Sequence, residues 1–189
     1  MSQLPQRKNI RLKDYDYSSN GMYFITVCCN NKYNYLGKIS CDENTTHKIS
    51  DYHLTDCRGG VLLHPSSEYP IVQLTNIGQI VSEQWYELKN RYQTIGLDQF
   101  VIMPNHIHGI ISIENDREEQ SPSPTISDII CAYKSITTKL SNKSDQSRGR
   151  IIWQRGYYEH IIRNQQELQE IREYIVNNPA KWQLDKYYM

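Results

Sequence analysis

The stretch FVIMPNHIHGIISIE, residues 100–114, is the most informative part of the chain. Two apolar runs that are rich in β-branched residues, 97–103 and 106–114, are separated only by Pro104 and Asn105. Strand-like runs with so short a connection are typical of a β-hairpin. The sequence therefore predicts two adjacent antiparallel strands here.

The second strand of this hairpin places two histidines on one side. Side chains at positions i and i+2 of a strand share a face, so His106 and His108 point the same way, while Ile107, Ile111 and Ile113 occupy the other face. This partition predicts an apolar side that helices cover and an open side that carries both imidazoles. Two imidazoles so placed can ligate a divalent cation and leave positions open for a substrate oxygen. Two polar residues on a solvent-facing strand also need no function, so the pair alone does not establish a metal site.

The rest of the chain predicts an α+β fold with a mostly antiparallel sheet and helices on one face. Ser123 and Pro124 are the predicted N-cap and first residue of the second helix. A single domain is predicted over residues 1–189, with a variable excursion at about 41–70 and mobile linkers at about 115–123 and 141–150. The further predicted elements are strands at 22–30 and within 151–164, and helices at 75–92, 124–140 and 165–178.

The composition favours a soluble cytoplasmic protein over a membrane-spanning or secreted one. The mean hydropathy is -0.69 and no apolar run approaches the roughly 20 residues needed to cross a bilayer, which predicts a soluble protein without a membrane partner. The first residues lack the apolar segment of a secretory signal, so a cytoplasmic location and five reduced cysteines are expected. Four residues of the excursion could suggest zinc, but their spacings match no common pairing: His47, His53, Cys57 and His64.

The charge balance is even, yet the basic residues are unevenly distributed. The 21 basic and 21 acidic residues cancel, which argues against a protein that coats nucleic acid through bulk charge. Two basic segments with interleaved tyrosines could contact phosphates and stack on unpaired bases, although such segments are also ordinary solvated surfaces. The candidate DNA-binding residues are Arg7, Lys8, Arg11, Lys134, Arg155 and Arg163.

The last predicted helix offers a nucleophile and a further ligand. Tyr174 and Asn178 are four residues apart and therefore share a helix face. An amide oxygen is a suitable donor to Mg²⁺ or Mn²⁺, and a phenol beside the metal can attack a phosphate. From the pattern alone, packing in the core for Tyr174 and a place at the helix end for Asn178 are the simpler explanation of these two residues. His160 lies in the predicted strand within 151–164. Its side chain is predicted either to face the histidine pair and support it, or to be an interior histidine.

Several separated segments, taken together, resemble the REP-associated tyrosine transposases, which are single-tyrosine HUH transposases of the insertion-sequence-200-like class. They match in the same order, and the resemblance covers nearly the whole chain apart from about 41–70. The segments are RLKDYDYSSNGMYFITVCCNN, LDQFVIMPNHIHGII, AYKSITTKL, WQRGYYEHIIRN and IREYIVNNPAKW.

The resemblance implies a ferredoxin-like two-layer fold with the HUH histidines, here His106 and His108, on a central strand. It implies that Tyr174 is the nucleophile and that Asn178 is a third ligand of Mg²⁺ or Mn²⁺. Members of the family cleave and rejoin single-stranded DNA beside hairpin-forming palindromes and leave a 5′-phosphotyrosine. A monomer or homodimer that works on the nucleoid is then expected, with single-stranded or hairpin DNA as its partner.

Two other functions remain open at this point. A non-catalytic module could bind a DNA hairpin with the same sheet and basic segments, and its binding would be sensitive to salt but indifferent to EDTA. A relaxase-like or replication-initiator-like nickase would share the two histidines and would cleave without rejoining a second strand.

Overall fold

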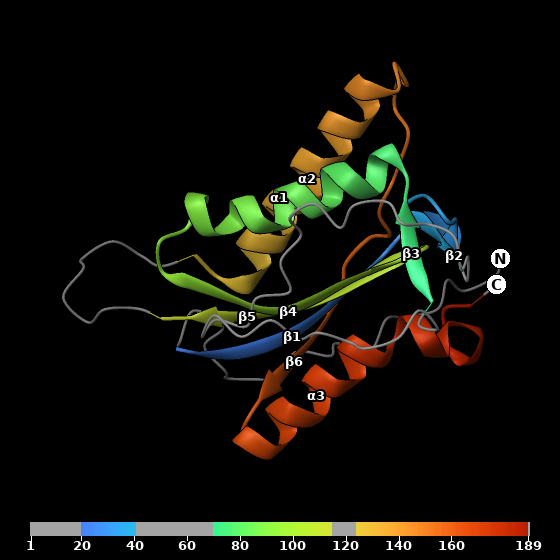
Figure 1. Ribbon diagram of the computed structural model, residues 1–189. Coiled ribbons are helices and arrows are strands. Elements are labelled where there is room, and N and C mark those ends of the chain that lie inside the picture. Colours follow the sequence, from blue (N-terminus) through green and yellow to red (C-terminus); the bar gives the residue numbers. More distant parts are fainter. Residues whose placement is uncertain (1–19, 41–69, 115–123, 189) are drawn as a thin grey trace, which may run out of the picture.

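The structure, a computed structural model, describes residues 20–40, 70–114 and 124–188 (Figure 1). The N-terminal basic residues, most of the 41–70 excursion and the 115–123 linker lie outside these ranges. The elements are β1 (Gly21–Cys28), the 3₁₀ helix η1 (Asn30–Lys32), β2 (Gly37–Ser40), β3 (Ile71–Leu74), α1 (Asn76–Arg91), β4 (Ile95–Met103), β5 (His106–Ile113), α2 (Ile126–Ser144), β6 (Tyr158–Ile162), α3 (Gln165–Asn177) and the 3₁₀ helix η2 (Pro179–Leu184).

Four antiparallel strands form the main sheet in the order β4-β5-β1-β6, and β2 pairs with β3 in a separate sheet. With α1 and α2 between the strands of the main sheet, the chain follows a β-α-β-β-α-β path, which is the ferredoxin-like arrangement. The predicted hairpin is confirmed, because Met103 pairs with His106 across the two-residue turn. Strand β5, which carries both histidines, is an inner strand of the sheet.

The first face of the sheet holds the main core, and α1 and α2 cover it (Figure 1). Trp85 of α1 stacks on Phe100 of β4 with the ring centroids 4.5 Å apart. The Tyr133 hydroxyl on α2 donates a hydrogen bond of 2.8 Å to the Val81 carbonyl on α1. A buried phenol needs such a partner, so this bond fixes how the two helices lie against each other.

Helix α3 lies against the opposite face (Figure 1), so the prediction that all helices share one face is wrong for this element. Ile110 and Phe24 are neighbours in the β5–β1 register and make that face apolar at its middle. Leu168 and Ile175 of α3 pack there and remove this apolar surface from water. The two histidines stand on the same face as Ile110, so they are buried rather than open to solvent.

The predicted helix boundaries hold at α1 and differ at α2. Helix α2 starts two residues later than predicted, because Thr125 and Asp128 form a capping box around its first turn. It also continues through Ser144, so the predicted linker 141–150 begins inside a helix. The small sheet of β2 and β3 was not predicted. Among the described residues, no helix is both long and apolar enough to span a membrane.

We expect Gly109→Ala to destabilise the fold, because Gly109 sits on β5 directly beneath Trp85. A Cβ at this position would come within 2.3 Å of the indole ring. Overpacking of this kind costs about 1–3 kcal/mol in free energy of unfolding, which urea titration would measure. Trp85→Phe opens space, so Gly109→Ala should cost less in that background. An equal cost in both backgrounds would contradict the steric cause.

Candidate functional site

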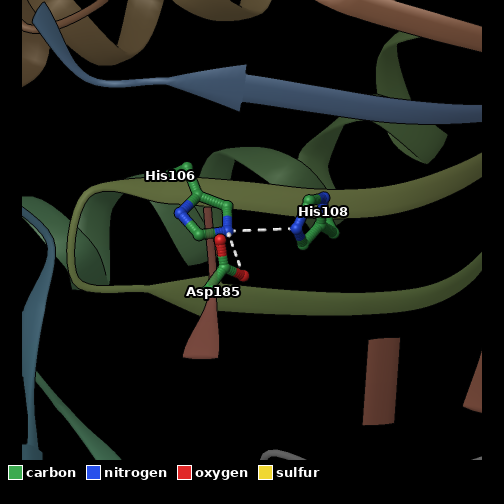
Figure 2. A group of neighbouring side chains, drawn as sticks. All are labelled: His106, His108 and Asp185. Atoms are coloured by element: carbon green, nitrogen blue, oxygen red, sulfur yellow. Dashed lines mark hydrogen bonds and ion pairs between the residues drawn. The ribbon is translucent and has the colours of Figure 1, made fainter. Parts of the chain in front are cut away.

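Two histidines on β5 form the centre of the site (Figure 2). The Nε2 atoms of His106 and His108 lie 3.0 Å apart, and both side chains are buried. Strand geometry explains their shared direction, and the packing of α3 on this face explains their burial. The sequence-based prediction of a shared face is therefore confirmed, while the prediction of an open face is wrong.

Asn105 determines the protonation of His106. Its side-chain nitrogen donates to the carbonyls of Lys32, at 3.1 Å, and Tyr187, at 2.8 Å. The amide oxygen then faces His106 Nδ1 at 2.9 Å and can only accept, so that nitrogen carries the proton. The lone pair of His106 is therefore on Nε2, which faces His108.

Thr26 orients the second histidine through a hydrogen bond to its outer nitrogen. Its hydroxyl lies 2.9 Å from His108 Nδ1, and it comes from β1, where Thr26 pairs directly with His108. The Nε2 atom of His108 is thus directed at the same point as that of His106. Two imidazoles oriented by hydrogen bonds on their outer nitrogens are typical of metal-ligating histidines.

The surroundings keep both imidazoles uncharged. Burial, followed by the charges of His108, Lys186 and Lys32, lowers the pKa of His106 to about 2. Burial, followed by Lys186, lowers the pKa of His108 to about 3. Neutral imidazole is the form that binds metals, so the pair is ready for a cation at neutral pH.

A carboxylate that the sequence analysis did not single out completes the group (Figure 2). The 3₁₀ helix η2 directs the chain back from α3 and places Asp185 Oδ2 3.9 Å from His106 Nε2. Since His106 is neutral, this contact is not an ion pair. One ligand atom from each of His106, His108 and Asp185 lies within 4.8 Å of the others, so the three can hold a metal ion.

The predicted nucleophile stands beside this group. The Tyr174 hydroxyl on α3 lies 3.2 Å from His108 Nε2, and its side chain is 41% exposed. Burial and the charge of Asp185 raise the pKa of Tyr174, while a hydrogen bond with Asn178 lowers it. The phenol is therefore protonated at neutral pH, within reach of solvent and of the histidines.

Asn178 is buried at the end of α3, where its side chain hydrogen-bonds Tyr174. Its Oδ1 atom is also buried and has no hydrogen-bond partner among the described residues. A buried amide oxygen without a partner is costly, so its position next to Tyr174 suits a ligand such as a cation. That Asn178 binds metal remains a prediction.

His160 does not reach the two histidines. Its Nε2 lies 2.6 Å from Glu167 Oε1, and this contact ties β6 to the first turn of α3. In the β1–β6 register His160 pairs with Phe24, two residues from Thr26. His160 therefore helps to place α3, and its role in supporting the site remains a prediction.

The described residues among the DNA-binding candidates differ in their surroundings. The Lys134 ammonium donates to the carbonyls of Gln154, at 2.6 Å, and Gly156, at 2.8 Å, and so holds the segment before β6. Arg155 and Arg163 are exposed. Arg7, Lys8 and Arg11 lie outside the described residues, as do the histidines and Cys57 of the excursion.

Acid should destabilise the metal-free protein through the two buried histidines. Their pKa values are lower in the folded than in the unfolded state, so the unfolded chain binds protons first as the pH falls below 6.5. The stability they contribute is complete above pH 6.5 and is lost toward pH 3. At pH 5 the free energy of unfolding should fall by about 2 kcal/mol for each histidine.

Urea unfolding in EDTA between pH 7.5 and pH 5 would measure this effect. The double variant His106→Gln/His108→Gln lacks both groups, so its stability should depend less on pH over this range. Equal slopes for the two proteins would show that other groups cause the acid sensitivity.

Comparison with known proteins agrees with this fold. The family described as "Transposase IS200 like" matches residues 53–178. A protein from Haemophilus influenzae, described as uncharacterized, is 34% identical over 97% of this chain and 93% of its own length. The solved structure of a REP-associated tyrosine transposase bound to a REP hairpin matches with a TM-score of 0.51 and 17% identity, over 97% of this chain and 77% of that chain. At that identity the likeness shows the fold.

Proposed function

Because the chain belongs to the IS200-like transposase family, we propose that it is a metal-dependent enzyme that cleaves and rejoins single-stranded DNA at hairpin-forming palindromes. The reaction passes through a 5′-phosphotyrosine on Tyr174. Hairpin DNA as the substrate is supported by the similarity of its fold to that of the hairpin-bound REP-associated transposase.

One observation carries this proposal. The hydroxyl of Tyr174 lies 3.2 Å from His108 Nε2, which in turn lies 3.0 Å from His106 Nε2, all within one chain. A nucleophile next to a metal-ligating pair is the arrangement that phosphoryl transfer requires, because positioning and charge stabilisation supply most of the catalysis. The exposure of the tyrosine gives a DNA strand access to it.

The residues present fit a divalent cation. When His108 Nδ1 donates to the Thr26 hydroxyl, the Nε2 lone pairs of both histidines face each other across 3.0 Å, and a cation between or beside them stabilises that arrangement. His106, His108 and Asp185 would hold the ion, and Asn178 would add an amide oxygen. The carboxylate and amide oxygens are donors that suit Mg²⁺ or Mn²⁺, and the two imidazole nitrogens favour Mn²⁺ of these two ions, because imidazole prefers transition metals. When bound, the ion supplies Lewis-acid polarisation of the scissile phosphate.

The covalent step follows from the position of Tyr174. Its oxygen attacks the phosphorus, a bond between them forms, and the bond from phosphorus to the 3′ oxygen breaks. The 3′ oxygen leaves with that electron pair and takes up a proton, while the phenolic proton passes to solvent. The phosphotyrosine conserves the energy of the phosphodiester, so a second 3′ hydroxyl can reverse the step and rejoin a strand without ATP.

A labelled-oligonucleotide assay tests the function. Hairpins with single-stranded flanks, taken from the DNA around the gene, are incubated with wild-type protein in Mn²⁺, Mg²⁺ or EDTA. A label on the 3′ segment should become covalently attached to the protein, and a label on the 5′ segment should be released with a free 3′ hydroxyl. EDTA should abolish both products.

The same assay separates the alternatives. Tight binding of the hairpin without any adduct in either metal would overturn the enzymatic proposal in favour of a binding module. An adduct that a second strand with a 3′ hydroxyl cannot resolve would favour a nickase.

A further inference from the structure

We propose that Lys186 binds the scissile phosphate of the DNA strand and stabilises the negative charge that builds on it, an inference that rests on the proposed function. Lys186 follows Asp185 in the turn after η2. Neither residue lies in a segment whose sequence suggested a site.

The turn that carries Lys186 is firmly anchored to the site. The Tyr187 backbone nitrogen donates to Asp185 Oδ1 at 2.7 Å, and the Tyr187 carbonyl accepts from Asn105 at 2.8 Å. The Lys186 carbonyl accepts from the Lys32 ammonium at 3.2 Å. These anchors use the backbone of Lys186 and leave its ammonium available for a ligand.

The ammonium of Lys186 lies near two aromatic rings that neighbour the histidine pair. It is 4.9 Å from the ring centre of Tyr187 and 6.0 Å from that of Tyr158. The Tyr187 ring lies 4.5 Å from that of His106, centre to centre. On the other side, Phe24 is in contact with Tyr158 and stacks on His108. The cation therefore stands at the edge of the metal group, on the side of exposed Tyr158.

The charge of Lys186 reaches the two histidines. It contributes to the lowered pKa of both His106 and His108, which places its positive charge in electrostatic reach of them. In the described part of the chain, no carboxylate forms an ion pair with it. A phosphodiester brings one negative charge to this site and gains more as the tyrosine attacks, so an unneutralised cation here favours the transition state.

Lys186→Met tests the inference, because methionine keeps an apolar stem of similar length and leaves the backbone anchors in place. The rate of adduct formation at saturating DNA should fall about 100-fold, the usual cost of removing one group that stabilises developing charge. Lys186→Arg should restore most of the rate. Lys181→Met, an exposed lysine on η2, is the matched control and should react like wild type.

Binding measurements with two oligonucleotides test whether Lys186 contacts the scissile phosphate. In the non-cleaving Tyr174→Phe background, Lys186→Met should weaken binding of the hairpin about 10-fold. The effect should shrink to about 2-fold or less when the scissile phosphate is a neutral methylphosphonate. A Lys186→Met protein that reacts like wild type, or an equal loss of affinity with both oligonucleotides, would overturn the inference while the proposed function stands. An inactive wild type would overturn the function itself.

Discussion

Tyr174→Phe should abolish the covalent protein–DNA adduct, with a loss of at least about 10⁴-fold in its rate of formation, because no oxygen remains to form the bond. The fold should persist, since the lost hydroxyl contacts are those of a partly exposed phenol and are worth about 1 kcal/mol. Denaturing gels of labelled hairpin DNA measure the adduct. Hairpin binding to the same protein should remain within about 3-fold of wild type, because the ring stays in place.

Tyr86→Phe is the matched control for this experiment. Tyr86 is 49% exposed and lies on α1, which covers the opposite face of the sheet. The control should form the adduct at the wild-type rate. An adduct that survives in Tyr174→Phe would show that another hydroxyl is the nucleophile, and mass spectrometry of the linked peptide would then identify it.

His106→Ala should remove metal binding and, with it, adduct formation. The histidine supplies one of the three ligand atoms that converge in the structure. Loss of a group that merely supports a ligand weakens metal binding by 10–100-fold, so loss of the ligand itself should exceed about 100-fold. In wild type, Mn²⁺ at 100 times its dissociation constant should add about 2.7 kcal/mol to the free energy of unfolding.

Thermal unfolding with and without Mn²⁺ measures this stabilisation, which should vanish in His106→Ala. Tyr86→Phe is again the control, because Tyr86 lies on α1, which covers the opposite face of the sheet, and should leave the Mn²⁺ effect intact. An unchanged Mn²⁺ effect in His106→Ala would place the metal elsewhere and would contradict the proposed site.

Local patterns were enough to predict the parts of the site that depend on one element. The alternation of His106 and His108 with isoleucines defined the shared face of β5, and the four-residue step defined that of Tyr174 and Asn178. The hairpin and α1 follow in the same way from short-range signals. These predictions required no knowledge of which surfaces meet.

Features that depend on packing between elements could not be predicted. The sequence did not show that α3 would cover the histidine face, because an amphipathic helix fits either side of a sheet. Asp185 follows a short 3₁₀ helix with no periodic signal, so only the folded chain brings it near His106. Thr26 and Asn105 likewise depend on the register of β1 and on the carbonyls of Lys32 and Tyr187.

The path of α3 has a consequence for how the activity depends on concentration. The contact between His160 and Glu167 holds the first turn of the helix. A bidentate hydrogen bond from the Arg172 guanidinium to the Asp98 carboxylate on β4 holds its middle. The phenol of Tyr174 and the two imidazoles therefore lie together within one chain. We therefore expect the proposed activity to survive dilution of the protein, whereas an enzyme whose active sites are assembled from two subunits would lose its activity.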